Sequence, residues 1–517
     1  MKITLISLAT VAFAIASVSA APIKKRAGDN KVVVGYWVPW GDVPVSAVDF
    51  TKYTHINYGF GTLLKSAANP TDINFDRYYD GDNMQQLVQK GSQYGVPILM
   101  SLGGWTGSET FSTVVADTNL RKTFINNAMV FVRENTNGDD ATTPNGWNMD
   151  GIDFDWEYPG RQGADNNAVS SADSANYLLL LKELRAQLDL EFPNNHKLIT
   201  AAVRVQPFDG PNGSPLSNVA AYAAYFDWIS IMAYDIYGSW SDTTGPVAPL
   251  GTPPSPNGPY SVTQAVQSWT AAGWPEDQLV VGTAFYGYSF TATVNMNTQN
   301  PITQYVPFTS GSNTASSDAC NGLYTTGATW SWKSLRSCIL TAGPTTAASG
   351  WTRYWDSNTQ TPWVFRASDK TFISYDDIES ITAKVNFVKQ KNLRGVMLWE
   401  IDYDINGELI GALNLVHSGS TTTTTASPTK TTTTVSKTTT AATTTTTVST
   451  KTTTTVAPTT TSGSSICSGV AAWSSSTTYA TPGSKVTYNG HLWTNQWWTL
   501  GETPGAAWGA WADGGAC

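Results

Sequence analysis

Three acidic side chains alternate along one short apolar stretch of the chain, residues 150–159. In a β-strand, alternate side chains share a face, so Asp153, Asp155 and Glu157 are expected to point to the same side. Neighbouring carboxylates in such a row lie roughly 6.6 Å apart along the strand. Burial of the row would raise the pKa values and leave at least one acid protonated near neutral pH. A protonated carboxyl group is what general acid catalysis requires.

An acidic strand has two other interpretations, a metal site and a solvated edge strand. No histidine lies in this stretch, which weakens the first interpretation. Ile152, Phe154 and Trp156 occupy the alternate positions, and their apolar side chains favour a buried strand over a solvated edge.

Composition limits the class of partner. Of the 517 residues only 13% are charged, 12% are aromatic and 21 are Trp. A chain with few charges and many indole rings suits an uncharged, ring-shaped ligand such as a polysaccharide. The net charge of −9 disfavours nucleic acid and anionic membranes as partners. No stretch is a convincing transmembrane span.

The chain divides into segments of different composition. Residues 1–20 have the pattern of a secretory signal peptide, and Lys25-Arg26 is a candidate dibasic site for removing a pro-segment, residues 21–26. Secretion predicts an extracellular, oxidising compartment, in which the four cysteines form two disulfides. Residues 418–464 are almost pure Thr, with Ser, Ala, Pro, Val and a few Lys, and are expected to form an extended linker.

Eight apolar runs alternate with helical patterns between residues 30 and 417, which predicts an α/β fold, a (β/α)8 barrel. In such a barrel the active site lies at the carboxyl ends of the strands, where Glu157, Tyr234-Asp235 and Trp399 all fall. The expected strands are residues 31–37, 53–60, 97–105, 150–157, 198–203, 225–234, 279–286 and 393–400, and the expected helices are residues 84–94, 124–134, 177–190, 263–272 and 380–391.

Two further structured parts are expected. Residues 289–371, between the seventh and eighth strands, are too long for a simple connection and predict an α+β insertion domain with a local disulfide between Cys320 and Cys338. Residues 465–517 predict a small all-β module with a hairpin turn at Asn489-Gly490, stapled by Cys467 and Cys517. Adjacent strand residues face opposite sides, so at least one of Trp497 and Trp498 is expected to be exposed for stacking on sugar rings.

The pattern Asp-x-x-Asp-x-Asp-x-Glu at residues 150–157 resembles the catalytic signature of family 18 glycoside hydrolases, the chitinases. The resemblance covers residues 30–417 and extends to the motifs at residues 101–104, 232–235 and 395–399. The insertion is similar to the chitinase insertion domain, which walls the substrate cleft in that family. The C-terminal segment is similar to chitin-binding modules of families 5 and 12, with Tyr488, Trp497 and Trp498 as its stacking side chains. One departure is Tyr288, where many relatives have Arg.

This resemblance implies a secreted, monomeric chitinase that acts on chitin and chito-oligosaccharides without a metal or an organic cofactor. Glu157 would be the general acid and base, Asp155 would orient the 2-acetamido group of the substrate, and Asp153 would share a proton with Asp155. Tyr234 would hydrogen-bond the acetamido oxygen and Asp235 would hold the distorted sugar. The implied substrate-binding side chains are Trp399, Tyr36, Trp105, Met232 and Tyr158.

Several alternatives stay open. Tyr36 and Trp105 could pack in the barrel instead of binding substrate. An endo-β-N-acetylglucosaminidase acting on N-glycans can share the barrel and the acidic motif, although the C-terminal module argues against it. A catalytically inactive chitin-binding lectin would usually lack the terminal acid, whereas Glu157 is present. A purely structural cell-wall protein would explain the Thr-rich segment but not the assembled acids.

Overall fold

The described residues of the computed structural model form two compact units, one before and one after the division at residues 424 and 425. Several predicted features lie outside the described residues, namely the signal peptide, the pro-segment, the linker beyond residue 418, Cys320, Trp497 and Trp498. The described residues are 31–75, 80–135, 146–254, 260–309, 326–418, 466–475, 477–479, 483–495, 499–500, 503–505 and 511–517.

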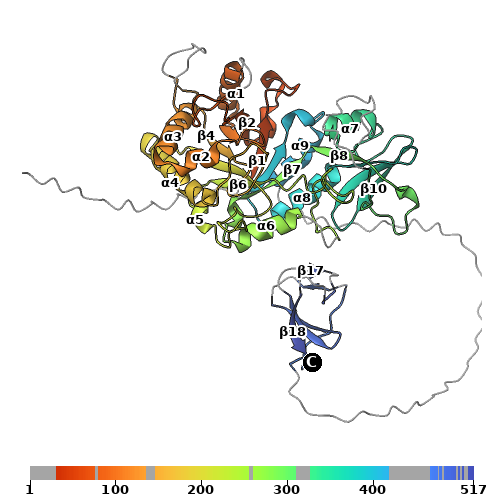
Figure 1. Ribbon diagram of the computed structural model, residues 1–517. Coiled ribbons are helices and arrows are strands. Elements are labelled where there is room, and N and C mark those ends of the chain that lie inside the picture. Colours follow the sequence, from red (N-terminus) through yellow and green to blue (C-terminus); the bar gives the residue numbers. More distant parts are fainter. Residues whose placement is uncertain are drawn as a thin grey trace, which may run out of the picture. The chain divides into compact units, whose positions relative to one another are not determined.

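Eight parallel strands close into a barrel in the first unit, as predicted (Figure 1). Their order around the barrel is β1-β13-β7-β6-β5-β4-β3-β2. Nearly every residue in them is buried, because helices cover the outside and side chains fill the inside, so the strands are mostly apolar, with a few buried polar residues such as Asp153 and Asp155 in β4. The strands are β1 (Val32–Trp37), β2 (His55–Gly61), β3 (Ile98–Gly103), β4 (Gly151–Asp155), β5 (Leu198–Val203), β6 (Trp228–Ile231), β7 (Leu279–Ala284) and β13 (Gly395–Trp399).

Alternate residues of the strands face the inside and the outside of the barrel. In β1, Val32, Val34 and Tyr36 belong to the cluster that fills the interior, whereas Val33 belongs to the larger core beneath the helices.

In the described part of the chain no helix combines the length and the apolar character needed to cross a membrane. The helices of the first unit are α1 (Asp80–Tyr94), α2 (Phe111–Ala116), α3 (Thr118–Val132), α4 (Asp173–Glu191), α5 (Ala220–Ala223), α6 (Val262–Ala271), α7 (Trp332–Cys338), α8 (Ile378–Gln390) and α9 (Glu408–Leu413).

Helix α3 begins six residues before the predicted start at Phe124. The reason is a cap: the Asp117 side chain accepts hydrogen bonds from the backbone N–H groups of Asn119 and Leu120. Helix α6 begins with a capping box between Ser261 and Gln264.

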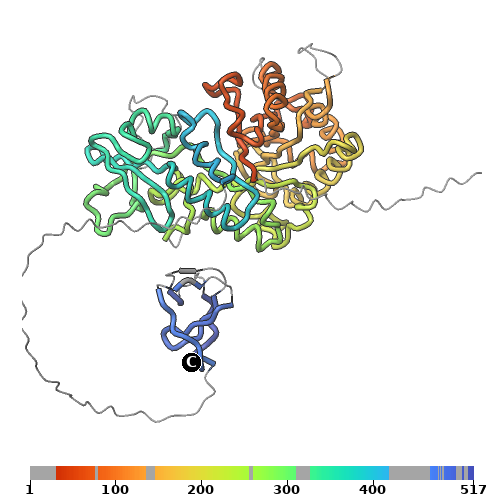
Figure 2. The backbone as a smooth tube through the Cα atoms, turned by 180° about the vertical axis from the view of Figure 1, so that it is seen from behind, coloured from red at the N-terminus to blue at the C-terminus, as the bar shows by residue number. Residues whose placement is uncertain are grey.

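The insertion domain is a five-stranded antiparallel sheet between β7 and β13, together with α7. It forms a lobe at one end of the barrel unit, drawn green to cyan in both views (Figures 1 and 2). The predicted seventh strand, residues 279–286, is in fact two strands, since β7 ends at Ala284 and β8 begins at Tyr286 in the insertion sheet. In the order β10-β11-β12-β8-β9, the strands are β10 (Trp351–Asp356), β11 (Thr361–Arg366), β12 (Thr371–Ser374), β8 (Tyr286–Thr291) and β9 (Thr329–Ser331).

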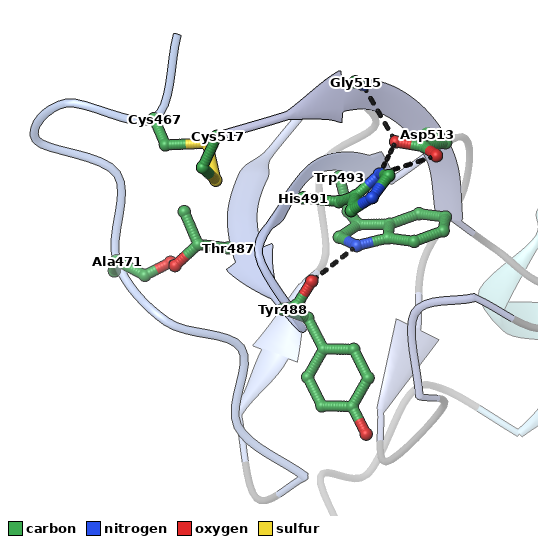
Figure 3. The surroundings of a disulfide bond; sticks show 9 residues. All are labelled: Cys467, Ala471, Thr487, Tyr488, His491, Trp493, Asp513, Gly515 and Cys517. Carbon is green, nitrogen blue, oxygen red and sulfur yellow. Dashed lines mark hydrogen bonds and ion pairs between the residues drawn. A yellow bond between two sulfur atoms is a disulfide. The ribbon is translucent and has the colours of Figure 1, made fainter. Parts of the chain in front are cut away.

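The second unit is small and all-β, as predicted, with a disulfide between Cys467 and Cys517 (Figure 3). Its hairpin turns at Asn489 and Gly490, whose φ values of 48° and 77° are left-handed, as a two-residue type I′ turn requires. Trp493 donates through its indole N–H to the carbonyl oxygen of Tyr488 at 3.0 Å. The strands are β15 (Lys485–Tyr488), β16 (His491–Asn495) and β18 (Trp511–Ala516) in one sheet, and β14 (Thr478–Tyr479) and β17 (Thr499–Leu500) in another.

Candidate active site

Asp153 lies inside the barrel, where neutral donors hold its carboxylate. Its Oδ2 accepts hydrogen bonds from the Tyr36 hydroxyl and from Ser101 Oγ, both at 2.7 Å. Its Oδ1 accepts a hydrogen bond from Thr200 Oγ1 at 2.5 Å. Burial raises the pKa of Asp153, and these hydrogen bonds, with another from Asn57, act in the opposite direction. The neighbours on β1, β3 and β5 therefore fix this carboxylate without supplying a charge.

The glycines at residues 103 and 104 allow β3 to pass close to the acidic strand. A Cβ on Gly103 would lie 2.3 Å from the carbonyl oxygen of Asp155, and the φ of Gly103 is +116°, so a side chain is excluded there. The backbone N–H of Gly104 donates to the same carbonyl oxygen at 2.8 Å. Ser108 Oγ donates to it as well, at 3.1 Å. The Ser-Leu-Gly-Gly motif thus anchors the acidic strand just before Glu157.

Asp155 and Glu157 are buried at the end of β4, with exposed fractions of only 5% and 8%. Asp155 Oδ1 has no hydrogen-bond partner among the residues that the structure describes. Its buried oxygen is therefore available to accept a donor from a ligand. The backbone of Glu157 is fixed on both sides, because its N–H donates to Ser108 Oγ at 3.2 Å and its carbonyl oxygen accepts from Asn167 Nδ2 at 2.9 Å.

The acids perturb one another. Burial raises the pKa of Asp155 well above its usual range, and the neighbouring charges of Glu157 and Asp153 raise it further. Burial also raises the pKa of Glu157 to about 7, with a further contribution from Asp235, whereas a hydrogen bond from Tyr158 lowers it. Glu157 can therefore hold a proton near neutral pH and release it there, which suits a group that acts first as acid and then as base.

A cavity of about 920 Å³ opens above these acids at the carboxyl ends of the strands. Both Asp155 and Glu157 line it, and its walls are rich in aromatic side chains. Trp40, Trp105 and Trp240 line it with exposed fractions of 46%, 53% and 62%, so much of each indole faces solvent and can meet a ligand. Trp399 also lines the cavity, and its ring stacks on Phe60 with centroids 5.7 Å apart.

Tyr234 and Asp235 follow the end of β6 and line the same cavity. Asp235 Oδ1 accepts hydrogen bonds from the hydroxyls of Tyr286 at 2.5 Å and Tyr288 at 2.8 Å. Both tyrosines belong to β8, so the insertion domain contacts the site directly. Burial raises the pKa of Asp235, while the two hydroxyl donors lower it.

The structure places most of the sequence-predicted site residues in this one cavity. Their roles in function remain predictions. Two of them, Tyr36 and Asp153, are buried and do not line the cavity. Tyr36 therefore forms a hydrogen bond to Asp153 instead of forming part of the cavity wall. Those that line the cavity are Glu157, Asp155, Tyr158, Met232, Tyr234, Asp235, Trp105 and Trp399.

Sequence reasoning missed several wall residues. Trp40 lies three residues beyond the end of β1, and Trp240 lies five residues beyond Asp235. An aromatic residue just past the carboxyl end of a barrel strand was the available signal for Trp40, whereas Trp240 lies too far beyond the end of β6 at Ile231 to give it. Tyr286 gave no such signal, because its position in the wall depends on the chain leaving the barrel after Ala284.

Comparisons with known proteins agree with this architecture. The sequence profile of the family described as "Glycosyl hydrolases family 18" matches residues 32–404. A chitinase-like effector from Moniliophthora roreri is 30% identical over 405 residues, which cover 74% of this chain and 92% of the effector. A chitinase structure from Rhizomucor miehei is 30% identical with a TM-score of 0.63, covering 75% of this chain and 100% of that one. A mutant class V chitinase from Nicotiana tobaccum in complex with NAG4 is 26% identical with a TM-score of 0.61, and the match covers 76% of this chain and 100% of that one.

Proposed function

The chain belongs to glycosyl hydrolase family 18, and on this premise we propose that it hydrolyses the β-1,4 bonds of chitin with retention of configuration. The observation that carries the proposal is the end of β4, where a buried Glu157 with a pKa of about 7 lies beside a buried Asp155 whose Oδ1 has no partner among the described residues. One group is suited to donate a proton, and the other to accept a hydrogen bond.

The proposed reaction uses the substrate as its own nucleophile. Glu157 gives its proton to the glycosidic oxygen while the bond from that oxygen to the anomeric carbon breaks. The 2-acetamido oxygen of the same sugar forms a bond to the anomeric carbon, which gives an oxazolinium ion. Asp155 Oδ1 accepts the hydrogen bond of the acetamido N–H and balances the positive charge.

Water completes the cycle. Glu157, now ionised, takes a proton from water as the oxygen attacks the anomeric carbon, and the bond to the acetamido oxygen breaks. Asp153 shares a proton with Asp155 and thereby helps it change between its two partners. The Tyr234 hydroxyl holds the acetamido oxygen, and Asp235 holds the distorted sugar ring.

Two variants test the assignment. We expect Glu157→Gln to lower the hydrolysis of a fluorogenic chito-oligosaccharide by at least about 10³-fold while oligosaccharide binding persists, because the amide cannot donate a proton in this role. Glu276→Gln is the matched control: this exposed glutamate precedes β7, at the opposite end of the barrel. A Glu157→Gln enzyme that stays active would contradict the assignment, and a wild type that binds but releases no sugar would identify a lectin.

The C-terminal module is proposed to bind insoluble chitin and so to raise the enzyme concentration at its surface. Its predicted stacking residues are Tyr488, Trp497 and Trp498; Tyr488 is half-buried at the end of β15. In the full chain, replacing all three by Ala should reduce retention on chitin beads and leave hydrolysis of a soluble oligosaccharide unchanged. Equal retention would refute this role.

Secretion remains a prediction from residues 1–20.

A further inference from the structure

Asp235 is held by two tyrosine hydroxyls that come from a different domain. The Tyr286 and Tyr288 hydroxyls both donate to Oδ1 of Asp235, at 2.5 and 2.8 Å. Neither hydrogen bond goes to Oδ2, so one carboxylate oxygen carries both donors. Asp235 also has a left-handed φ of 56°, which fixes the direction of its side chain at some backbone cost.

Tyr288 is held in the insertion sheet by both neighbouring strands. It pairs with Ser374 of β12 and with Thr329 of β9, which places the residue between two neighbouring strands. Its ring contacts those of Tyr286 and Trp240 in edge-to-face arrangements, with centroids 5.6 and 5.7 Å apart. Tyr288 does not line the cavity, whereas Asp235 and Tyr286 do. Its contact with the site is therefore made through Asp235.

Ionisable groups surround Asp235 from several elements, and those that interact with it are acids or phenols. Within the described ranges Asp235 forms no ion pair. A cation, Arg204, lines the same cavity, but its carboxylate partner is Asp209. The groups that face Asp235 are Glu157 and Tyr158 after β4, its chain neighbour Tyr234, and Tyr286 and Tyr288 on β8. Tyr403, in the segment after β13, faces Tyr288.

We propose that Tyr288 is a positioning residue: with Tyr286 it keeps Asp235 ionised while Glu157 keeps its proton, so that the insertion domain sets the acidic side of the working pH range. This inference rests on the proposed function, since it concerns the same two acids. Its physical basis is the neutrality of the donors.

A hydroxyl and a cation would affect the two acids differently. A hydroxyl stabilises the ionised carboxylate that it touches, and its influence falls off within a short distance. A cation at the same position would stabilise ionised Asp235 but also ionised Glu157, because charge acts over a longer range in a buried site. Two phenols therefore favour the ionised form of Asp235 without drawing the proton from Glu157.

The test compares pH profiles of kcat/KM on a fluorogenic chito-oligosaccharide. Tyr288→Phe removes one donor, so Asp235 becomes protonated at higher pH and the acidic limb should move up by about one pH unit. Tyr288→Arg introduces a charge, so both limbs should move to lower pH. The matched control is Tyr354→Phe, which removes the hydroxyl bonded to Asn297 Oδ1 in the same domain, away from the cavity, and should leave both limbs in place.

A second measurement does not need turnover. In a Glu157→Gln background, the pH midpoint for binding an N-acetylglucosamine tetramer, followed by tryptophan fluorescence, should also rise by about one unit in Tyr288→Phe. Unchanged limbs and an unchanged midpoint in a folded Tyr288→Phe protein would overturn the inference. A wild type that binds the tetramer but hydrolyses nothing would refute the proposed function, and the midpoint would still decide the role of Tyr288.

Discussion

The hydroxyl of Tyr36 donates a 2.7 Å hydrogen bond to Oδ2 of Asp153, deep in the barrel. The ring of the same tyrosine contacts Trp399, with centroids 5.5 Å apart. Tyr36 therefore connects Asp153 with Trp399, which lines the cavity. Burial raises the pKa of this tyrosine well above its usual range, and the charges of Asp153 and Asp155 raise it further, so the hydroxyl remains a donor.

Tyr36→Phe should weaken both the fold and the reaction. The loss of a buried hydrogen bond to a carboxylate is expected to lower the free energy of unfolding by about 1–3 kcal/mol and to lower kcat, because Asp153 would be protonated more readily. Urea denaturation and steady-state kinetics measure the two effects. Tyr222→Phe is the control, since its hydroxyl donates to the carbonyl oxygen of Ser174 at 2.6 Å, and its loss should affect stability alone.

Activity should fall on the alkaline side with the ionisation of Glu157. Its pKa is about 7, and the acid works only while protonated, so kcat/KM should decrease roughly tenfold per pH unit above about pH 7. A pH profile between 4 and 9 on a soluble oligosaccharide measures this. A profile that stays flat to pH 9 would show that Glu157 is not the proton donor.

The same pKa predicts a pH-dependent stability. Because the folded value of about 7 exceeds the ordinary value of 4.5, the folded protein binds this proton more tightly than the unfolded chain does. The contribution is complete below about pH 4.5 and lost as the pH rises through about 7. Relative to Glu157→Gln, the wild type should therefore lose on the order of 2–3 kcal/mol between pH 4.5 and pH 8. Denaturation curves of both proteins at the two pH values test the sign.

The barrel could be predicted from sequence because its signals are local. Each strand is a mostly apolar run, and the carboxyl ends of such strands must meet on one rim, so the order of the runs was enough to place Glu157, Tyr234 and Trp399 together. The contact of Asp235 with Tyr288 could not be predicted in this way. It depends on pairing between β8 and β12, which are 80 residues or more apart in the chain, and no local pattern encodes that register.

Gly238 is predicted to control the position of one cavity wall. A Cβ there would lie 2.3 Å from the indole of Trp240, so Gly238→Ala should displace that ring. We expect KM for a long chito-oligosaccharide to rise about 5- to 30-fold, the effect of losing about 1–2 kcal/mol of ring contact, with a smaller change in kcat. Gly411→Ala in α9 is the control, because its Cβ would meet no atom within 4 Å and should be neutral or stabilising. An unchanged KM would show that Trp240 does not contact the oligosaccharide.

The disulfide of the second unit should be essential to that unit. Cys467 and Cys517 are 50 residues apart, and a loop of that length corresponds to about 4 kcal/mol of stabilisation in the chain-entropy model. Replacing both by Ser should lower the retention of the full chain on chitin beads at 37 °C, while hydrolysis of a soluble oligosaccharide persists. Full retention would mean that the three-stranded sheet holds the module without the bond.

The passage from β7 to β8 through the single residue Phe285 has a consequence for modularity. An exchange of this insertion domain with that of another protein would naturally place the joints at the ends of the inserted sheet, outside β8 and β12. Here such a joint would transplant Tyr286 and Tyr288 together with the sheet, and would therefore change the partners of Asp235. A chimera that keeps Tyr286 and Tyr288 as the partners of Asp235 must therefore place its first joint after Tyr288, within β8.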